Sequence, residues 1–211
     1  MSKDWRTLGF ITTQLNFSNK LVFEALTPVE KALFNPYLKF VEEQVALPWQ
    51  RVCAAAVKHE LGSPALSLVM QMLPDSQEIA ETTYRRFTQL LPNHHSRRGG
   101  LSNPGVTHSC LRDLNMFQAY LWLCVLEESM AAVEQELVGL CVMVMQSVEV
   151  KWEMIEQWTK VLTDEIMRRL NPEQKSLLLP YTQKIHQAFL EKRVQLGANP
   201  LPALSQLLDA G

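Results

Sequence analysis

The chain has 211 residues, of which 47% are hydrophobic and 20% are charged, and its formal net charge is −2. This length and balance suit a globular domain with a sizeable core and exclude an intrinsically disordered chain. Because the charge is near neutral and the basic residues are scattered, we expect no nucleic-acid-binding surface.

The first predicted elements are helical. Residues 1–25 carry spaced apolar side chains that indicate one helix or two short ones, forming an N-terminal helical extension. Thr27 and Glu30 have the spacing of a capping box, which predicts a second helix over residues 28–46. A proline then interrupts the pattern, and residues 49–61 indicate a further helix.

Two more helices and a loop are predicted in the middle of the chain. Residues 64–72 follow a serine that can cap a helix, and residues 77–91 follow a proline break. Residues 92–105 contain prolines, glycines, paired histidines and paired arginines, which is typical of a loop. This loop leads into the segment that we expect to form the centre of the fold.

The segment from Thr107 to Glu128 is predicted to be the central helix of the core. Its polar start holds a cysteine, an arginine and an aspartate within four positions, and the run that follows is apolar on nearly every side. A helix that is apolar on every face must be covered on every face. With about a dozen apolar residues between charged flanks, the segment is too short to cross a bilayer.

Three further helices are predicted after the central one. Residues 131–146 are apolar almost throughout, residues 150–170 are amphipathic, and Asn171 can cap a last helix that ends near residue 196. A loosely held tail is expected beyond it. Since no segment alternates as a strand does, the fold class is all-α, and two nearly all-apolar helices favour globin-like packing over a four-helix bundle.

The sequence lacks a secretory signal, a membrane-spanning segment and closely spaced pairs of cysteines. The N-terminus lacks the apolar region of a secretory signal, and no apolar run reaches about 18 residues, so we expect a soluble cytoplasmic protein without a transmembrane segment. The cysteines stand singly, which favours neither a disulfide framework nor a zinc site: Cys53, Cys110, Cys124 and Cys141.

The run Cys110-Leu111-Arg112-Asp113 resembles the C-x-R-D signature of phycobiliproteins, the globin-like light-harvesting proteins of cyanobacteria and red algae that carry linear tetrapyrroles, or bilins. Tyr120 falls where the family has the first tyrosine of its R-Y-x-x-Y stretch, and Gly139 follows at almost the family's spacing. The resemblance is clearest over residues 79–140 and extends less closely over 26–168. Upstream, the A-x-x-x-Y-x-x-F pattern of the family is matched by Ala80, Tyr84 and Phe87.

The resemblance implies a globin-like phycobiliprotein fold and a bilin cofactor, phycocyanobilin or a related one. In the family, the cysteine sulfur adds to a side group of ring A, the aspartate accepts hydrogen bonds from pyrrole N–H groups, and the arginine pairs with a propionate. In this chain the resemblance gives these roles to Cys110, Asp113 and Arg112. Cys110 and Asp113 share a helix face, and a thiol near a helix N-terminus and an arginine is expected to have a lowered pKa.

Four other residues are candidates for the bilin site. Arg97 and Arg98 precede Cys110 in the chain, and they either pair with bilin propionates or belong to a solvated basic loop. Tyr84 and Tyr120 are candidates because they occupy positions that match the family's tyrosines.

The chain also departs from the family pattern. Ala119 and Leu123 replace the arginine and the second tyrosine of the R-Y-x-x-Y stretch. We expect residues 1–170 to form the globin-like domain and residues 171–211 to form a C-terminal extension with an extra helix. These departures fit a branch associated with bilin biosynthesis, in which the pocket holds a bilin transiently, passes it between enzymes or holds none.

Other chemistry is disfavoured. His94 and His95 lie in a loop beside arginines, where a solvated or propionate-contacting role is favoured over haem ligation. No H-E-x-x-H pattern or similar metal-ligand spacing occurs. His108 and Cys110 are two residues apart and point to different sides of a helix, so they do not form a nucleophile and its base. We therefore expect no enzyme.

Three functional interpretations stay open. The first is a bilin-binding protein of light harvesting or bilin biosynthesis. The second is a non-pigmented interaction or regulatory globin associated with phycobilisomes or bilin-synthesising enzymes, and the third is a light or stress sensor.

The cytoplasmic face of the thylakoid is a candidate location. A homodimer, or pairing with a related globin subunit, is expected through the N-terminal helices, with candidate contacts at Trp5, Phe10, Phe17 and Phe23.

Overall fold

The computed structural model describes residues 47–197, without the side chains of residues 146–148. The regular secondary structure of the described part is helical apart from one short hairpin, β1 (His95–Ser96) and β2 (Gly99–Gly100), so the all-α class is confirmed. Its helical elements, in chain order, are residues 47–56, α3 (Pro64–Met72), the 3₁₀ turn η1 (Leu73–Asp75), α4 (Ser76–Leu90), α5 (Pro104–Glu127), the π-helical segment η2 (Val133–Leu137), α6 (Val138–Val148), α7 (Trp152–Met167) and α8 (Pro172–Gln195).

Several predictions fall outside the described residues. These are the helices expected over 1–25 and 28–46, the tail from residue 198 on, and the candidate dimer contacts Trp5, Phe10, Phe17 and Phe23. Within residues 47–197, no helix combines the length and the apolar character that spanning a bilayer requires.

Side-chain caps explain where α3, α5 and α8 begin. The Ser63 side chain accepts a hydrogen bond from the Leu66 amide at the start of α3, and Asn171 forms a capping box with Gln174 at the start of α8. Asn103 caps α5, which therefore begins at Pro104, earlier than the predicted start.

The first described helix ends earlier than predicted. It was expected over residues 49–61 but ends at residue 56, and the chain turns before Gly62, whose φ is +89°. The His59 side chain holds this turn against the end of α5, because its Nε2 lies 2.6 Å from the carbonyl oxygen of Leu126. A tertiary contact therefore replaces the last helical turn that the sequence pattern indicated.

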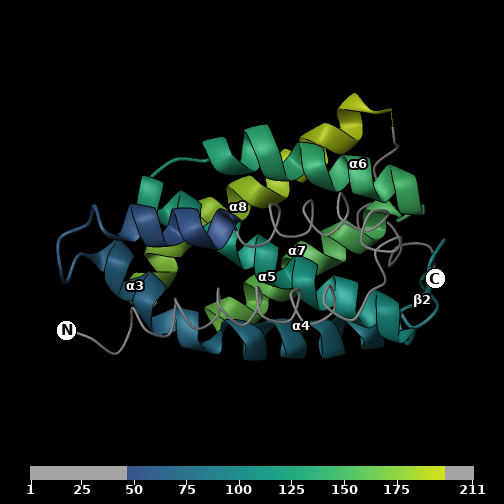
Figure 1. Cartoon of the computed structure of the whole chain (residues 1–211), viewed down its shortest axis with the longest axis horizontal. Coiled ribbons are helices and arrows are strands. Elements are labelled where there is room, and N and C mark those ends of the chain that lie inside the picture. Colours follow the sequence, from purple (N-terminus) through teal and green to yellow (C-terminus); the bar gives the residue numbers. More distant parts are fainter. Residues whose placement is uncertain (1–46, 198–211) are drawn as a thin grey trace, which may run out of the picture.

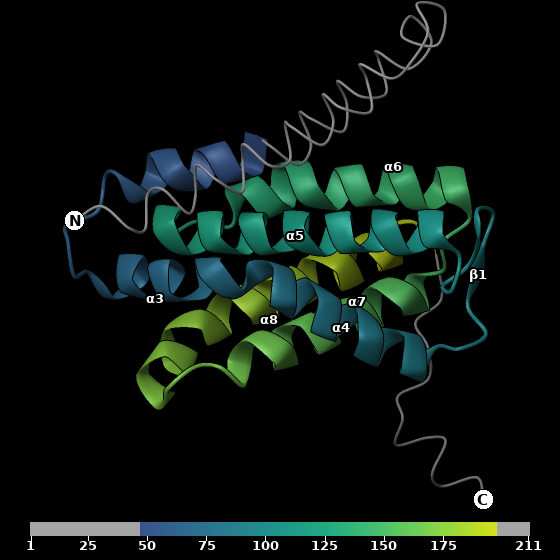
Figure 2. The ribbon, with the colours of Figure 1, turned by 60° about the horizontal axis from the view of Figure 1, so that its bottom comes forward.

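The predicted central position of α5 is confirmed. Figures 1 and 2 show α5 running through the middle of the molecule, between α6 on one side and α4 on the other. From Leu114 to Leu126 it is buried on nearly all sides, with fully covered side chains at Leu114, Trp122, Leu123 and Cys124. The apolar run after Asp113 is thus explained by cover on every face.

The last helix packs on the same core as the others. Leu178, Ile185 and Phe189 of α8 are buried, and the Phe189 ring stacks on Phe117 of α5 with ring centroids 5.7 Å apart. The division into a domain ending at residue 170 and a C-terminal extension stays a prediction.

A charged cluster joins α4 to α7. Glu165 of α7 is buried and accepts hydrogen bonds from Arg169 in the turn that follows α7 and from Arg86 of α4, the latter at 3.1 Å. Arg169 also donates to Glu78 of α4 at 3.1 Å. This cluster fixes how α7 lies on α4, and therefore the position of one wall of the cavity described next.

Candidate functional site

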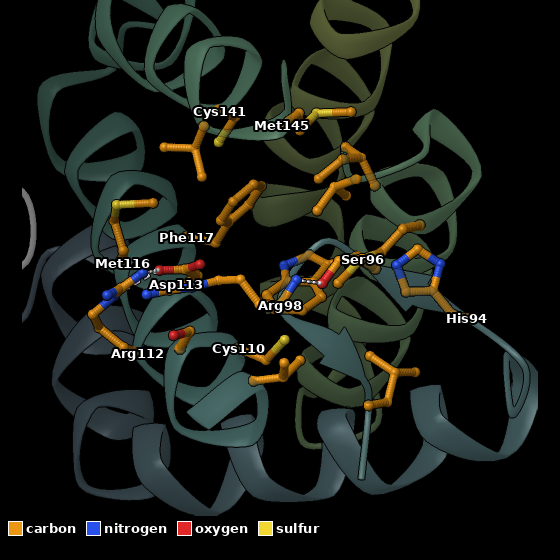
Figure 3. A pocket seen from close by; sticks show the side chains of 18 of the residues that line it. His94, Ser96, Arg98, Cys110, Arg112, Asp113, Met116, Phe117, Cys141 and Met145 are labelled. Atoms are coloured by element: carbon orange, nitrogen blue, oxygen red, sulfur yellow. Dashed lines mark hydrogen bonds and ion pairs between the residues drawn. The ribbon is translucent and has the colours of Figure 1, made fainter. Parts of the chain in front are cut away.

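A cavity opens between α5, α6, α7 and the loop that carries β1 and β2 (Figure 3). Its empty volume is about 1020 Å³, counted out to the open mouth. Most of its lining is apolar, with Phe117 from α5, Met145 from α6 and Trp158 from α7 among the lining residues. The polar lining residues gather on α5 and the loop: His94, Ser96, Arg98, Ser109, Cys110, Arg112 and Asp113.

Cys110 lies in the second turn of α5 and is buried, with 5% of its surface exposed. Burial and, to a smaller extent, the Asp113 carboxylate raise the pKa of its thiol to about 12, and Arg112 only partly opposes them. The predicted lowering of this pKa is therefore wrong. Desolvation outweighs the arginine because the thiol faces an apolar cavity and the carboxylate stands on the same face of the helix.

Arg112 and Asp113 form an ion pair with each other. The Nε and Nη2 atoms of Arg112 both donate to Oδ1 of Asp113, at 2.8 and 2.6 Å. Burial raises the pKa of Asp113, whereas Arg112, Arg98 and His108 act to lower it. Arg112 thus folds back along α5 onto its neighbour, and the pair presents an oriented carboxylate at one side of the cavity (Figure 3).

The two loop arginines have different positions. Ser96 accepts a hydrogen bond from the Arg98 amide at 3.2 Å and donates to the Gly99 carbonyl at 3.2 Å. Gly99 has a φ of +117°, a conformation that favours glycine and lets the chain turn back into β2. Both arginines are exposed, but only Arg98 lines the cavity, and Arg97 lies outside the lining.

The two candidate tyrosines also lie outside the lining. The Tyr84 hydroxyl donates to the carbonyl of Leu101, so it fixes the end of the loop against α4. The Tyr120 hydroxyl donates to Glu136 of η2 at 3.3 Å, and Glu136 pairs with Arg51 at 2.7 Å. Both tyrosines hold elements around the cavity in place, and a direct bilin contact by either one stays a prediction.

The structure brings Cys110, Arg112, Asp113 and Arg98 to one cavity and adds walls that sequence reasoning missed. These walls come from α6, through Leu140, Cys141 and Met145, and from α7, through Met154, Ile155 and Trp158. The spacing of Met154 and Trp158 showed that they share a helix face, but the same spacing is typical of any core-facing helix. Among residues 47–197, no group of His, Cys, Asp and Glu side chains could hold a metal ion.

Comparison with protein families identifies the family of the chain. A family model described as phycobilisome protein matches residues 56–189, which is more than half of the chain. The matched span contains all the elements that line the cavity and most of α8. No curated protein matches the chain.

Proposed function

Because the chain belongs to the phycobilisome protein family, we propose that it is a phycobiliprotein-like globin that binds a linear tetrapyrrole in the cavity between α5, α6 and α7. Membership gives the molecule its globin-like fold and a phycobiliprotein-like role in light harvesting. The observation that carries the proposal is the placement of Cys110, Arg112 and Asp113 on the wall of one mostly apolar cavity.

The chemistry of the lining fits such a ligand. The apolar side chains of α6 and α7 suit flat conjugated rings, and the Asp113 carboxylate can accept hydrogen bonds from pyrrole N–H groups. Arg98 and Arg112 can pair with propionates near the same side of the cavity. The bilin, when bound, supplies the absorption of visible light.

Cys110 supplies the thiol for a thioether bond. Because burial keeps its pKa near 12, very little thiolate is present at neutral pH. We therefore expect reversible binding to precede a slow covalent attachment. A transient or biosynthetic role for the pocket is compatible with this order, and no catalytic role is assigned to any residue.

The proposal is tested by producing the protein in cells that also make phycocyanobilin, followed by zinc-enhanced fluorescence on a denaturing gel. We expect a fluorescent band from the natural chain that Cys110→Ala abolishes. Cys53→Ala is the matched control, because Cys53 lies outside the cavity lining, and it should keep the band. A band that survives in Cys110→Ala would contradict attachment at Cys110.

A dark gel also has a defined meaning. If the native protein is coloured while the denatured band is dark, the bilin is bound reversibly. If neither shows pigment, the alternative function is favoured, which is a non-pigmented interaction globin associated with phycobilisomes or bilin-synthesising enzymes.

A further inference from the structure

The His94 side chain enters the cavity from the loop that follows α4. It is half-buried, and its Nε2 atom is hidden from solvent yet has no hydrogen-bond partner among the residues that the structure describes. Leaving a buried polar nitrogen unpaired is unfavourable. An unpaired nitrogen in the wall of a cavity is therefore a group that a bound ligand can satisfy.

The backbone around His94 is held in place. Its amide donates to the carbonyl of Leu91 at 3.1 Å, and the next residue, His95, pairs with Gly100 in the hairpin. The imidazole thus extends from a turn whose backbone is held by hydrogen bonds, and this turn positions the ring in the cavity.

His94 lies across the cavity from the ion pair of α5. Figure 3 shows Arg112 and Asp113 on one side, His94 on the other, and Ser96 between them. Arg98 lies close enough to Asp113 to lower the pKa of that carboxyl, so the cationic groups suited to propionates are at the Asp113 side. A ligand held by Cys110 and Asp113 would present its opposite end to His94.

The charge state of His94 suits a neutral partner. Burial lowers its pKa, Lys151 and His95 lower it further, and Glu153 opposes them. Lys151 and Glu153 stand at the start of α7, and His95 follows in β1. The imidazole is therefore neutral at pH 7, and its ring N–H can donate to a carbonyl oxygen rather than pair with a carboxylate.

We propose that His94 is a positioning residue that donates a hydrogen bond from Nε2 to the carbonyl oxygen of the terminal lactam ring farthest from Cys110. This inference rests on the proposed function and deepens it, because it states which end of the bilin lies at which end of the cavity.

The test uses the full chain carrying Cys110→Ala, so that binding stays reversible. The protein is titrated with phycocyanobilin, and the dissociation constant is measured from the quenching of tryptophan fluorescence, since Trp158 lines the cavity. We expect His94→Phe to weaken binding about tenfold, which corresponds to one lost hydrogen bond of about 1.4 kcal/mol. His94→Gln keeps a donor near the Nε2 position and should restore most of the affinity.

His95→Phe is the matched control, because His95 is the neighbouring histidine, is exposed and lies outside the lining. It should leave the dissociation constant unchanged. As a second measurement, the ¹⁵N chemical shift of His94 Nε2 should change when the bilin is added. Equal affinities of His94→Phe and its parent, or an equal loss in His95→Phe, would overturn the assignment. A parent protein that binds no bilin would overturn the proposed function as well.

Discussion

At Cys110, two neighbouring charges and the apolar cavity act on the same thiol. Burial and Asp113 raise its pKa to about 12, and Arg112 lowers it only in part. The thiol is therefore protonated at neutral pH, and its reactivity is limited by the small thiolate fraction. This balance depends on tertiary burial, which the motif C-x-R-D by itself does not reveal.

The first prediction concerns this thiolate. Alkylation of Cys110 by iodoacetamide should become about tenfold faster for each pH unit between 7 and 10, because the thiolate fraction rises by that factor while the pH is below the pKa. Asp113→Asn removes one cause of the raised pKa and should speed alkylation at every pH. Mass spectrometry of the peptide that contains Cys110 gives the rate, and a plateau below pH 9 would contradict the assigned pKa.

The residues of the candidate site could be predicted only in part. Cys110, Arg112 and Asp113 are close in sequence on one helix, so a short motif was enough to group them. Arg97 and Arg98 are adjacent between β1 and β2, yet only Arg98 lines the cavity. Which of two adjacent side chains faces a cavity depends on backbone dihedral angles, and a dipeptide sequence does not determine these angles.

At the scale of elements, the contact between α4 and α7 holds the apolar wall of the cavity in position. Glu165 is at its centre, with hydrogen bonds from Arg86 and Arg169. Although burial acts to raise it, these bonds lower the pKa of Glu165 below its ordinary value of 4.5. A carboxyl with a lowered folded-state pKa stabilises the protein above the unfolded value, and this contribution is lost as the pH falls through the folded value.

The second prediction follows from this cluster. Glu165→Gln should lower the free energy of unfolding by about 2 kcal/mol at pH 7, because two arginines lose a buried ionic partner. The difference from the natural chain should shrink as the pH falls below 4.5. Urea unfolding followed by circular dichroism measures both effects.

Glu60→Gln is a control for the loss of a carboxylate at an exposed turn. It should change the free energy of unfolding by less than about 0.5 kcal/mol. A difference between Glu165→Gln and the natural chain that stays constant from pH 7 to pH 3 would show that ionisation of Glu165 does not stabilise the contact.

Helix positions were predicted well where local signals exist and poorly where they do not. Asn171 and Ser63 cap helices through their own side chains, so α8 and α3 begin as expected. The π-helical segment η2 and the β1–β2 hairpin were not predicted. η2 is held by the contacts of Glu136 with Tyr120 and Arg51, residues that are distant from it in sequence.

At the scale of the whole molecule, one helix unites the core and the candidate site. The second half of α5 is buried among the other helices, while its first turns line the cavity with Cys110, Arg112 and Asp113. The central helix and the membership of the phycobiliprotein superfamily were both predicted from the sequence. The match over residues 56–189 confirms the family. The cavity itself could not be predicted, since its walls come from segments that only the fold brings together.

The most direct test of the central claim is an absorbance titration of the natural chain with phycocyanobilin. If the cavity binds the bilin, the visible band should shift and sharpen, and the change should saturate at one bilin per chain. Rigid surroundings and the Asp113 carboxylate at the pyrrole N–H groups are the physical reason for this change. A visible spectrum identical to that of free phycocyanobilin, in the presence of an excess of folded protein, would contradict the assignment of this cavity as a bilin site.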